Sequence, residues 1–465
     1  MLKPFLLSLS LLLVFNVKAE LNLDLPKGFV LPVHVAANQQ QFSAPLKSQI
    51  NGLKILRKLR GSKRYLEDPE ISAWIRDLGN MLVSRSLGST SPFYFLVSKS
   101  TSLNAFATEG GVVVINSGLI LKSDSESEVA AVLAHEIAHV AQRHITRLKA
   151  KAKNNKWGTN AALVAGMIAS TKNSQAGQAI MNTTIATLAH KQLSFTREAE
   201  AEADREGLRI LTRAGFNPLA MPAVLQKLEQ FGDTNTAGVR EYLQNHPLTQ
   251  RRVSDTLARA KRLGKYQGKE RPAFFYIREK VRVLSNSPLS IPNNVTAPIK
   301  KYGLAQKLNK QKRYSGALGL LGVSSKQLSE GLLIAHLLAT TNQHKKAQDV
   351  LQSLSAIYPH SETIAIPLAE AYLALNQVDK AWQVLERIKE SEQTSLGFFE
   401  VKQKTAQLIK RPSQVYYALA QRNIRLSNYK VAKAQLKKAI SLQGNGKNHY
   451  KMKRSLSLLE NFIKP

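Results

Sequence analysis

The chain has 465 residues, with 66 lysines and arginines against 32 aspartates and glutamates, a net charge of +34, and no cysteine. The length and the 43% hydrophobic content fit two or three globular domains and exclude wholesale disorder. The absence of cysteine excludes disulfides, a thiolate nucleophile, iron–sulfur clusters and cysteine-ligated zinc, so any metal must be held by histidines and carboxylates.

The charge makes a nucleic-acid binder the first interpretation and a protein that works near an anionic membrane the second. The N-terminus helps to decide, because Lys3 is followed by the apolar run 5–15 and then by Ala19. This pattern predicts a secretory signal peptide over 1–19, cleaved near Ala19. An exported protein meets little nucleic acid, so we expect no nucleic-acid partner and favour an anionic membrane surface. A second apolar stretch, 161–169, is too short to span a bilayer, which predicts a soluble or peripheral protein.

The first half of the chain mixes helix and strand patterns. Asp68-Pro69-Glu70 is typical of a helix start. The runs 93–97 and 112–115 predict strands. Ser125 and Glu128 predict the start of a long helix. Another helix is expected over 197–213, where glycine and proline follow.

A change in composition and periodicity along the chain predicts the domain organisation. The segment 285–299 is polar, contains three prolines and has no periodicity, so we expect a linker between a domain over 20–284 and a second over 300–465. In the second domain, alanines recur at similar motifs with spacings of 30, 34 and 51, namely Ala317, Ala347, Ala381 and Ala432. Thirty-four is the tetratricopeptide period. The predicted fold is mainly α, an α+β domain with a small sheet followed by an α-solenoid of tetratricopeptide-like repeats. An irregular helical bundle stays open as the alternative.

The segment His135-Glu136-Ile137-Ala138-His139 lies inside the expected long helix. Positions four apart share one helix face, so both imidazoles can reach a single ion, and Glu136 can touch a water molecule there. This is the H-E-x-x-H arrangement of zinc peptidases. The alternative is a pair of ordinary surface histidines.

Catalytic zinc needs a third protein ligand and an open position for water. One class of these enzymes has a third histidine ten residues after the first, but this chain has Ile145 there. His144 comes one residue early and is expected on the helix surface. The third ligand is then expected from the acidic segment 197–207.

Helical geometry distinguishes between the acids of this segment. One stripe alternates in charge and is expected to face solvent; it consists of Glu202, Glu206, Arg209 and Arg213. Glu200 and Asp204 share the other face with Gly207 and leucines, and an acid on a packed face needs a partner. We therefore assign Glu200 as the third ligand and Asp204 as an acceptor for the far nitrogen of a ligating histidine. Gly207 would let the helices approach closely. Ordinary surface charge is the alternative.

The chemistry of such a site is peptide hydrolysis. Zinc lowers the pKa of a bound water to about 7 and polarises a carbonyl group. Glu136 would take the proton of the water and return it to the leaving amine.

At this point the chain resembles a known family, the zinc metallopeptidases that include the bacterial heat-shock protease HtpX and the CaaX-prenyl proteases. Four motifs carry the resemblance: His135-Glu136-x-x-His139, Glu200-x-x-x-Asp204 with Gly207, Asn104-Ala105-Phe106-Ala107 before Gly110-Gly111, and His246-Pro247-Leu248-Thr249-x-x-Arg252. The resemblance implies an endopeptidase of the gluzincin type with one Zn²⁺ per chain.

The combination of signal peptide, peptidase domain and repeat array resembles the members of this family that act in envelope quality control. That resemblance implies a periplasmic location and unfolded or misassembled outer-membrane proteins as substrates. It also implies the β-barrel assembly machinery as a partner of the repeat domain. The residues by themselves predict only an exported zinc hydrolase with a helical binding array.

Two further sites depend on the resemblance. The strand 112–115 is interpreted as an edge strand that binds an extended substrate, with a buried strand as the alternative; the substrate-binding candidates are Asn104, Ala105, Val112, Val113 and Val114. His246, with Arg252 nearby, could stabilise the oxyanion of the tetrahedral intermediate. It could instead be a fourth zinc ligand that displaces the water and silences the enzyme, or a structural histidine.

The leading hypothesis is a zinc-dependent endopeptidase with a chaperone-like role in outer-membrane protein assembly. The alternative is a periplasmic chaperone or adaptor with little or no protease activity. The stretch 411–465 holds twelve lysines and arginines and one acid, Glu460. It is either a solvated surface or a binding surface for lipid or protein.

Overall fold

The computed structural model describes residues 39–62, 64–86, 92–108, 110–148, 196–233, 242–243, 245–264, 266, 268, 270–287, 295–444 and 446–463. The predicted signal peptide over 1–19 and the apolar stretch 161–169 lie outside these residues. The chain divides into two units, 1–44 and 45–465, and the second holds nearly all the described residues. Among these residues, no helix combines the length and the apolar character needed to cross a membrane.

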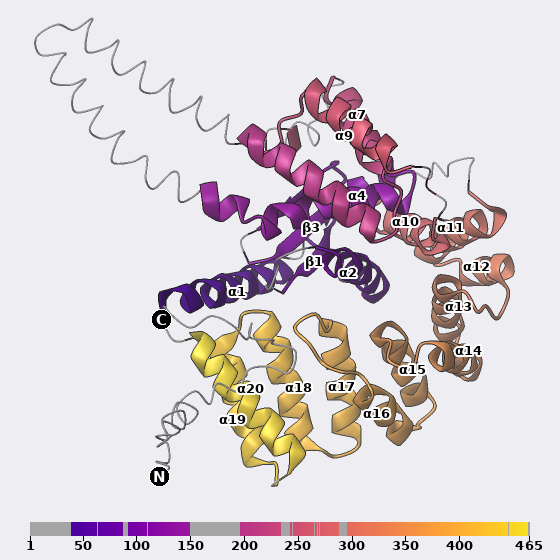
Figure 1. The fold of residues 1–465 in the computed structure, drawn as a ribbon. Coiled ribbons are helices and arrows are strands. Elements are labelled where there is room, and N and C mark those ends of the chain that lie inside the picture. Colours follow the sequence, from indigo (N-terminus) through magenta and orange to yellow (C-terminus); the bar gives the residue numbers. More distant parts are fainter. Residues whose placement is uncertain are drawn as a thin grey trace, which may run out of the picture. The chain divides into compact units, whose positions relative to one another are not determined.

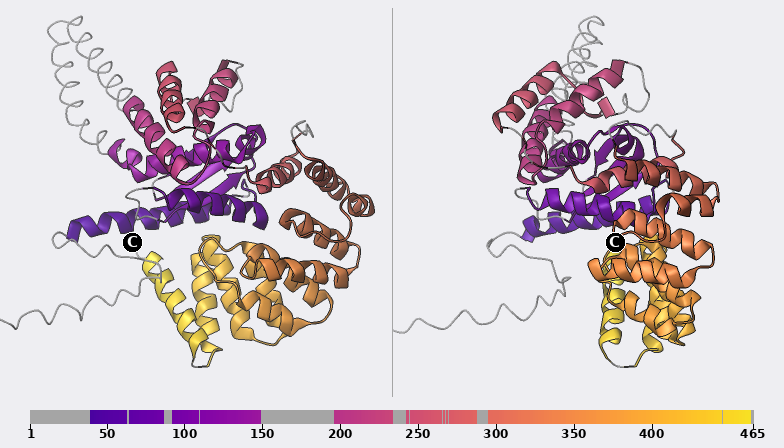
Figure 2. Two further views of the ribbon diagram at one scale, coloured as in Figure 1. Left: turned by 45° about the vertical axis from the view of Figure 1, so that its right-hand side comes forward. Right: turned by 90° about the vertical axis from the view of Figure 1, so that its right-hand side faces the viewer.

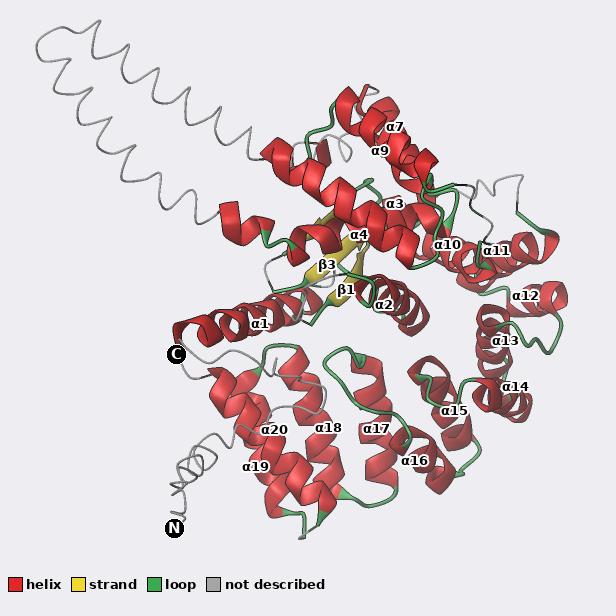
Figure 3. Ribbon diagram, in the orientation of Figure 1, coloured by secondary structure: helices red, strands yellow, loops and turns green. Residues whose placement is uncertain are grey.

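The described residues between 39 and 284 form helices around a small sheet (Figures 1 and 3). The elements are α1 (Gln39–Arg60), α2 (Pro69–Val83), β1 (Tyr94–Ser98), β2 (Ala105–Ala107), β3 (Val112–Asn116), α3 (Ser117–Lys122), α4 (Glu126–Ala141), a helix described over 196–213, α7 (Ala220–Asp233), α9 (Gln250–Arg262) and α10 (Pro272–Leu284). The predicted helix starts are confirmed. The Asp68 carboxylate accepts hydrogen bonds from two backbone N–H groups of α2, and the Ser125 hydroxyl accepts one at the start of α4.

The sheet has the order β1-β3-β2, with β1 parallel and β2 antiparallel to β3. Helices cover both faces of β3: Val113 and Ile115 belong to the core cluster of α2 and α4, whereas Val112 and Val114 pack with Leu56 of α1. All five residues of β3 are buried. A strand buried on both faces is a continuous apolar run, which is the pattern 112–115 shows in the sequence.

The interpretation of 112–115 as an edge strand was therefore wrong. Because β3 is the central strand, its backbone N–H and C=O groups pair with β1 on one side and with β2 on the other. Val112, Val113 and Val114 have no free backbone edge to offer an extended substrate.

The second half of the chain consists of helices joined by short connections (Figure 2). They are α11 (Ala297–Lys310), α12 (Tyr314–Leu321), α13 (Leu328–Thr340), α14 (His344–Ile357), α15 (Glu362–Ala374), α16 (Val378–Glu386), α17 (Leu396–Leu408), α18 (Pro412–Arg425), α19 (Tyr429–Ser441) and α20 (Lys447–Ile463). Since α11 begins at Ala297, the last three residues of the predicted linker, 297–299, are helical.

The turns repeat with the same period as the alanines. Lys312, Asn342 and Asn376 follow α11, α13 and α15, each with a positive φ between 57° and 61°. Their spacings of 30 and 34 equal those of the first three alanines, because each turn and the alanine of the next helix belong to one repeat unit. Asparagine tolerates this left-handed conformation better than most residues.

An additional helix explains the spacing of 51 between Ala381 and Ala432. Lys410 and Ser427 both have positive φ, so α17, α18 and α19 follow one another through two tight turns. These two turn residues lie 17 positions apart in the sequence, and 17 is also the difference between the spacing of 51 and the 34-residue period. The repeat series therefore contains one inserted helix.

The two halves of the unit share polar contacts. Arg57 of α1 forms an ion pair with Glu392, Nη2 to Oε1, at 2.9 Å. Gln393 Nε2 donates to the Phe93 carbonyl at 3.4 Å, and Thr363 Oγ1 donates to the Pro69 carbonyl at 3.3 Å. Residues of the array thus contact the chain next to β1 and α2.

A close approach at Gly207 brings the helix over 196–213 against α4. A Cβ atom at Gly207 would lie 3.1 Å from both the N and the Cα of His135, which are backbone atoms that cannot move aside. The glycine therefore permits the distance at which the two helices cross, as its place on the packed face predicted.

We expect Gly207→Ala to lower the free energy of unfolding by about 1–3 kcal/mol, because the added methyl group overpacks the contact. The measurement is the midpoint of urea unfolding followed by far-ultraviolet circular dichroism. Gly319→Ala is the matched control: it is a helical glycine with no atom within 4 Å of the added Cβ, so it should be neutral or stabilising by about 0.5–1 kcal/mol. Equal midpoints for Gly207→Ala and the unmodified chain would contradict the close approach.

Candidate metal centre

Two imidazoles and a carboxylate meet between α4 and the helix over 196–213. His135 Nε2 lies 3.0 Å from His139 Nε2, one turn apart on α4. The Glu200 carboxylate lies 3.3 Å from each of these nitrogens, Oε2 toward His135 and Oε1 toward His139. The three side chains predicted as metal ligands are thus brought together, and all are buried.

A fourth donor comes from His246, which precedes α9. Its Nδ1 lies 3.1 Å from Glu200 Oε1 and 3.4 Å from His135 Nε2. The Tyr242 ring, one turn earlier, stacks on the imidazole with centroids 4.7 Å apart and fixes its plane. One ligand atom from each of His135, His139, Glu200 and His246 lies within 4.8 Å of all the others. Of the three roles open for His246, this position fits the fourth ligand.

The carboxylate of Glu136 is buried beside these donors, and one of its two oxygens lacks a hydrogen-bond partner in the part of the chain that the structure describes. Its side chain is 2% exposed, and Oε1 has no hydrogen bond among the described residues. That oxygen lies 3.5 Å from His246 Nε2. An orphaned carboxylate oxygen beside three imidazoles and a carboxylate fits a site built for a divalent ion, where the oxygen would accept a proton from water.

Asp204 supports His135 as the sequence predicts. Its Oδ1 lies 3.1 Å from His135 Nδ1, the ring nitrogen that faces away from the donor group. Burial alone raises the pKa of Asp204, but the hydrogen bonds from Arg252 and His135 outweigh it and leave the pKa below its ordinary value. Asp204 is therefore held as an anion and can accept a hydrogen bond from His135, which leaves the other nitrogen free for a metal.

The guanidinium of Arg252 is occupied by partners within the site. Nε and Nη2 donate to the two oxygens of Asp204 at 2.7 and 2.8 Å, and Nη1 donates to the Pro247 carbonyl at 2.9 Å. Nη1 also lies 2.9 Å from Glu200 Oε2. Arg252 thus ties both acids of the site to α9, a role that the sequence did not suggest. The i, i+4 spacing of Tyr242 and His246 is a signal that was also missed.

Two predictions about charged residues near the site were wrong. His144 is buried instead of lying on the helix surface, with its Nδ1 2.9 Å from His139 Nδ1. Glu206 is also buried, although its stripe was expected to face solvent, and it pairs with Arg209 at 2.8 Å. The rest of this stripe is less buried: Glu202 is half-buried, and both of its arginines are exposed.

The outer edge of the sheet beside α4 is β2. Asn104 accepts a hydrogen bond from Asn116 N, and Thr108 N donates to Val112, so these two residues face β3. In an antiparallel ladder the residues between them, Ala105 and Ala107, turn their N–H and C=O groups away from the neighbour. β2 thus has an outward backbone edge, which the predicted edge strand 112–115 lacks. Asn104 is buried, and its side-chain oxygen has no partner among the described residues.

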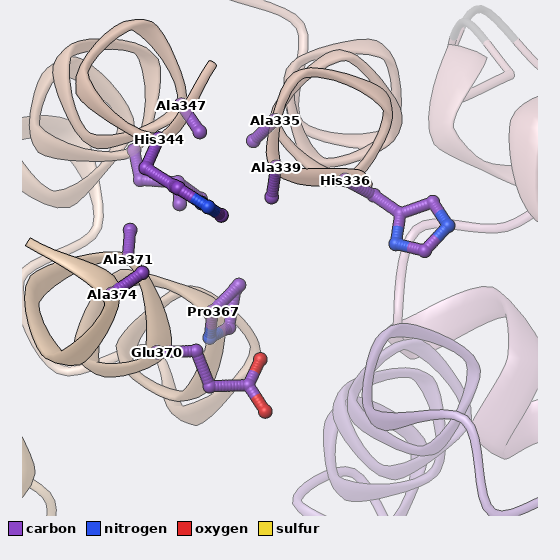
Figure 4. A pocket seen from close by; sticks show the side chains of 10 residues that line it. Ala335, His336, Ala339, His344, Ala347, Pro367, Glu370, Ala371 and Ala374 are labelled. Atoms are coloured by element: carbon purple, nitrogen blue, oxygen red, sulfur yellow. The ribbon is translucent and has the colours of Figure 1, made fainter. Parts of the chain in front are cut away.

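The repeat array contains a cavity of about 160 Å³ between α13, α14 and α15 (Figure 4). Ala335, Ala347 and Ala371 are buried in its lining, and their short side chains leave the space open. His344 projects into this space from α14, and Glu370 comes from α15. The volume is close to that of an engineered cavity of about 150 Å³ that holds benzene, so one ring or branched aliphatic side chain can enter.

Comparison with known proteins agrees with this architecture. The profile of peptidase family M48 matches residues 69–260, and a tetratricopeptide-repeat profile matches residues 338–396. The chain is 31% identical over 349 residues to the beta-barrel assembly-enhancing protease of Yersinia pestis, covering 71% of each chain. It is 38% identical over 208 residues to the Escherichia coli O157:H7 protein of the same name, covering 45% of this chain and 42% of that one.

A further relative matches over a shorter stretch of the chain. The chain is 33% identical over 167 residues to the mitochondrial metalloendopeptidase OMA1 of Arabidopsis thaliana, covering 36% of this chain and 31% of that one. The predicted fold class, a peptidase domain with a small sheet followed by tetratricopeptide repeats, is confirmed, and the irregular bundle is excluded.

We expect Glu200→Gln to weaken divalent-metal binding by about two orders of magnitude, or about 2.8 kcal/mol, because the site loses its one negatively charged ligand. The measurement is competition with a chelator, with bound metal counted by elemental analysis. Glu198→Gln is the matched control, because Glu198 is exposed on the same helix. Unchanged affinity in Glu200→Gln would show that the carboxylate is not a ligand.

Proposed function

The chain belongs to the M48 family of metallopeptidases, and on that premise we propose that it is a zinc-dependent endopeptidase of the periplasm that degrades misassembled outer-membrane β-barrel proteins. The observation that carries the proposal is the orphaned oxygen of Glu136 beside the His135, His139 and Glu200 donors. Three protein ligands and a neighbouring buried carboxylate are what hydrolytic zinc sites use.

The residues of the site divide the work of peptide hydrolysis between them. His135, His139 and Glu200 would hold zinc, which when bound supplies Lewis acidity for the scissile carbonyl and for the attacking water. Glu136 takes the proton of that water and returns it to the leaving amine. Asp204 and Arg252 keep the ligands in place, so no reorganisation is needed during the reaction.

The substrate is proposed to bind as an additional strand along β2. The outward N–H and C=O groups of Ala105 and Ala107 can pair with an extended backbone, independently of its sequence. Such pairing suits a protease that acts on unfolded chains of many sequences.

His246 is proposed to keep the enzyme latent. Its Nδ1 belongs to the donor group, and its Nε2 faces Glu136 Oε1 at 3.5 Å. It thus occupies both the open coordination position and the approach to the general base. Catalysis then requires that the segment carrying His246 moves away.

The array is proposed to recruit clients and the β-barrel assembly machinery. The cavity between α13, α14 and α15 supports this role, because it can take an apolar side chain of an unfolded segment. Binding to an anionic membrane surface stays a prediction from charge alone. Export is part of the proposal, and a mature chain that does not begin near Glu20 would contradict it.

A second candidate function is a periplasmic chaperone or adaptor with little protease activity. The position of His246 favours it, because a site with four protein ligands leaves no place for water. Full biological function of a cell that carries only Glu136→Gln would support this alternative.

We expect Glu136→Gln to lower cleavage of a denatured outer-membrane β-barrel protein by about 10²–10⁴-fold, because the amide cannot accept the proton of water. The measurement is the rate of cleavage by purified zinc-loaded protein, and Glu198→Gln should cleave at the rate of the unmodified chain. Bound zinc should be unchanged in Glu136→Gln. Loss of zinc together with activity would mean that Glu136 holds the metal and is not the base.

The same variant serves as bait for clients, because it should bind substrates without cutting them. Proteins retained by Glu136→Gln in a periplasmic extract are to be identified by mass spectrometry. The proposal requires that outer-membrane β-barrel proteins are enriched. Their absence would contradict the proposed substrate class while leaving the peptidase chemistry intact.

We expect His246→Ala to increase cleavage by about tenfold, the gain for a chain that spends about nine-tenths of its time in the latent arrangement. The measurement is again the cleavage rate, with His360→Ala as the control because His360 is exposed in the array. A loss of activity would instead support the oxyanion role of His246, and an unchanged rate would support a structural one.

A further inference from the structure

His144 lies behind the second histidine of the metal centre, on the side away from the donor group. His139 directs Nε2 toward Glu200 and His135, whereas its Nδ1 lies 2.9 Å from His144 Nδ1. The two rings are nearly perpendicular, with an angle of 77° and centroids 4.9 Å apart. His144 is not part of the group of metal donors.

The second nitrogen of His144 also has a partner. Nε2 lies 3.1 Å from Glu202 Oε2, and the same oxygen accepts a hydrogen bond from Arg147 Nη1 at 3.0 Å. His144 is 4% exposed. Glu202 and His144 therefore form a continuous series of contacts that leads from the partly exposed Glu202 carboxylate to the ring of His139.

The backbone explains why His144 reaches His139 at all. On a continuous α-helix, residues five apart point about 140° away from each other. Here α4 ends at Ala141, and Arg143 has a φ of 55°, so the chain turns before His144 begins the next helical segment. The turn brings the imidazole back under α4.

Once His139 binds a metal, the donor and the acceptor in each of these hydrogen bonds are fixed. A neutral imidazole that ligates through Nε2 must carry its proton on Nδ1. That N–H donates to His144 Nδ1, which leaves the proton of His144 on Nε2. The Nε2–H group then donates to Glu202. Every donor meets an acceptor, and no alternative assignment satisfies all three groups.

We propose that His144 is a positioning residue for the metal centre: with Glu202 behind it, it fixes the tautomer and ring plane of His139, as Asp204 does for His135. The two histidines of the H-E-x-x-H segment thus have different supports, one a buried carboxylate and the other a neutral imidazole backed by a partly exposed carboxylate. The inference rests on the proposed zinc site and deepens it.

The experiment compares three replacements of His144 by their zinc affinity. His144→Ala removes the acceptor, and His144→Phe removes it while filling the space with a ring. His144→Asn keeps an acceptor oxygen near the place of Nδ1. Outer partners of metal ligands are worth 10–100-fold in affinity, so we expect losses of about 10–100-fold in Ala and Phe and less than about threefold in Asn. The affinity is measured by competition with a chelator.

The order of the variants separates positioning from packing. If His144 only fills space, Phe should retain affinity and Asn should lose it, which is the opposite of the order proposed. Unfolding temperatures of the metal-free variants identify any that fail to fold. Glu202→Leu gives an independent measurement, because Glu202 is partly exposed and can be replaced without a buried defect; we expect a loss of about tenfold.

The outcomes distinguish this inference from the proposed function. If the unmodified chain binds no zinc, the proposed function fails. If the unmodified chain binds zinc and His144→Phe binds it equally well, only the role of His144 is overturned. Full affinity in Glu202→Leu would remove Glu202 from the series and overturn the coupled support.

Discussion

The metal centre depends on the close crossing of two helices at Gly207 and the backbone of His135. At that distance the carboxylate of Glu200 reaches both imidazoles of α4, and Asp204 reaches the far nitrogen of His135. A buried carboxylate without a partner costs several kcal/mol. Packing and electrostatics therefore support each other here, because separating the helices would take from both acids their histidine partners on α4.

The rest of the polar structure keeps this arrangement rigid. Arg252 binds Asp204 and Glu200 together, and burial in the absence of such partners would protonate the acids instead of leaving them as ligands. For Glu200, burial raises the pKa, but hydrogen bonds to the three histidines outweigh it and hold the pKa well below its ordinary value. Three separate elements thus contribute to one preformed set of donors.

His246 is the donor that comes from neither α4 nor the helix over 196–213. It belongs to the segment between α7 and α9, and the Tyr242 ring and the Glu200 carboxylate hold it in place. The array contacts α1 of the same unit through the ion pair between Glu392 and Arg57.

Local patterns were sufficient to predict most elements and the principal residues that meet at the site. The caps at Asp68 and Ser125, the i, i+4 pair on α4 and the packed face of Glu200 and Asp204 follow from neighbours within one or two helical turns, where periodicity is informative. The repeat period likewise followed from the chain, and its irregular spacing of 51 became intelligible as one inserted helix.

What the sequence could not determine depends on contacts between distant segments. The apolar run 112–115 has the same composition whether its strand is central or at an edge, and only pairing with β1 and β2 decided this. His144 looked like a surface residue because helical periodicity was extended past Arg143, whose positive φ ends it. Arg252 reaches the centre from α9, and His246 reaches it from the chain just before α9. The sequence by itself determined which side chains could bind a metal, whereas the tertiary structure decided which of them are held in place, because burial and long-range pairing are properties of the folded chain alone.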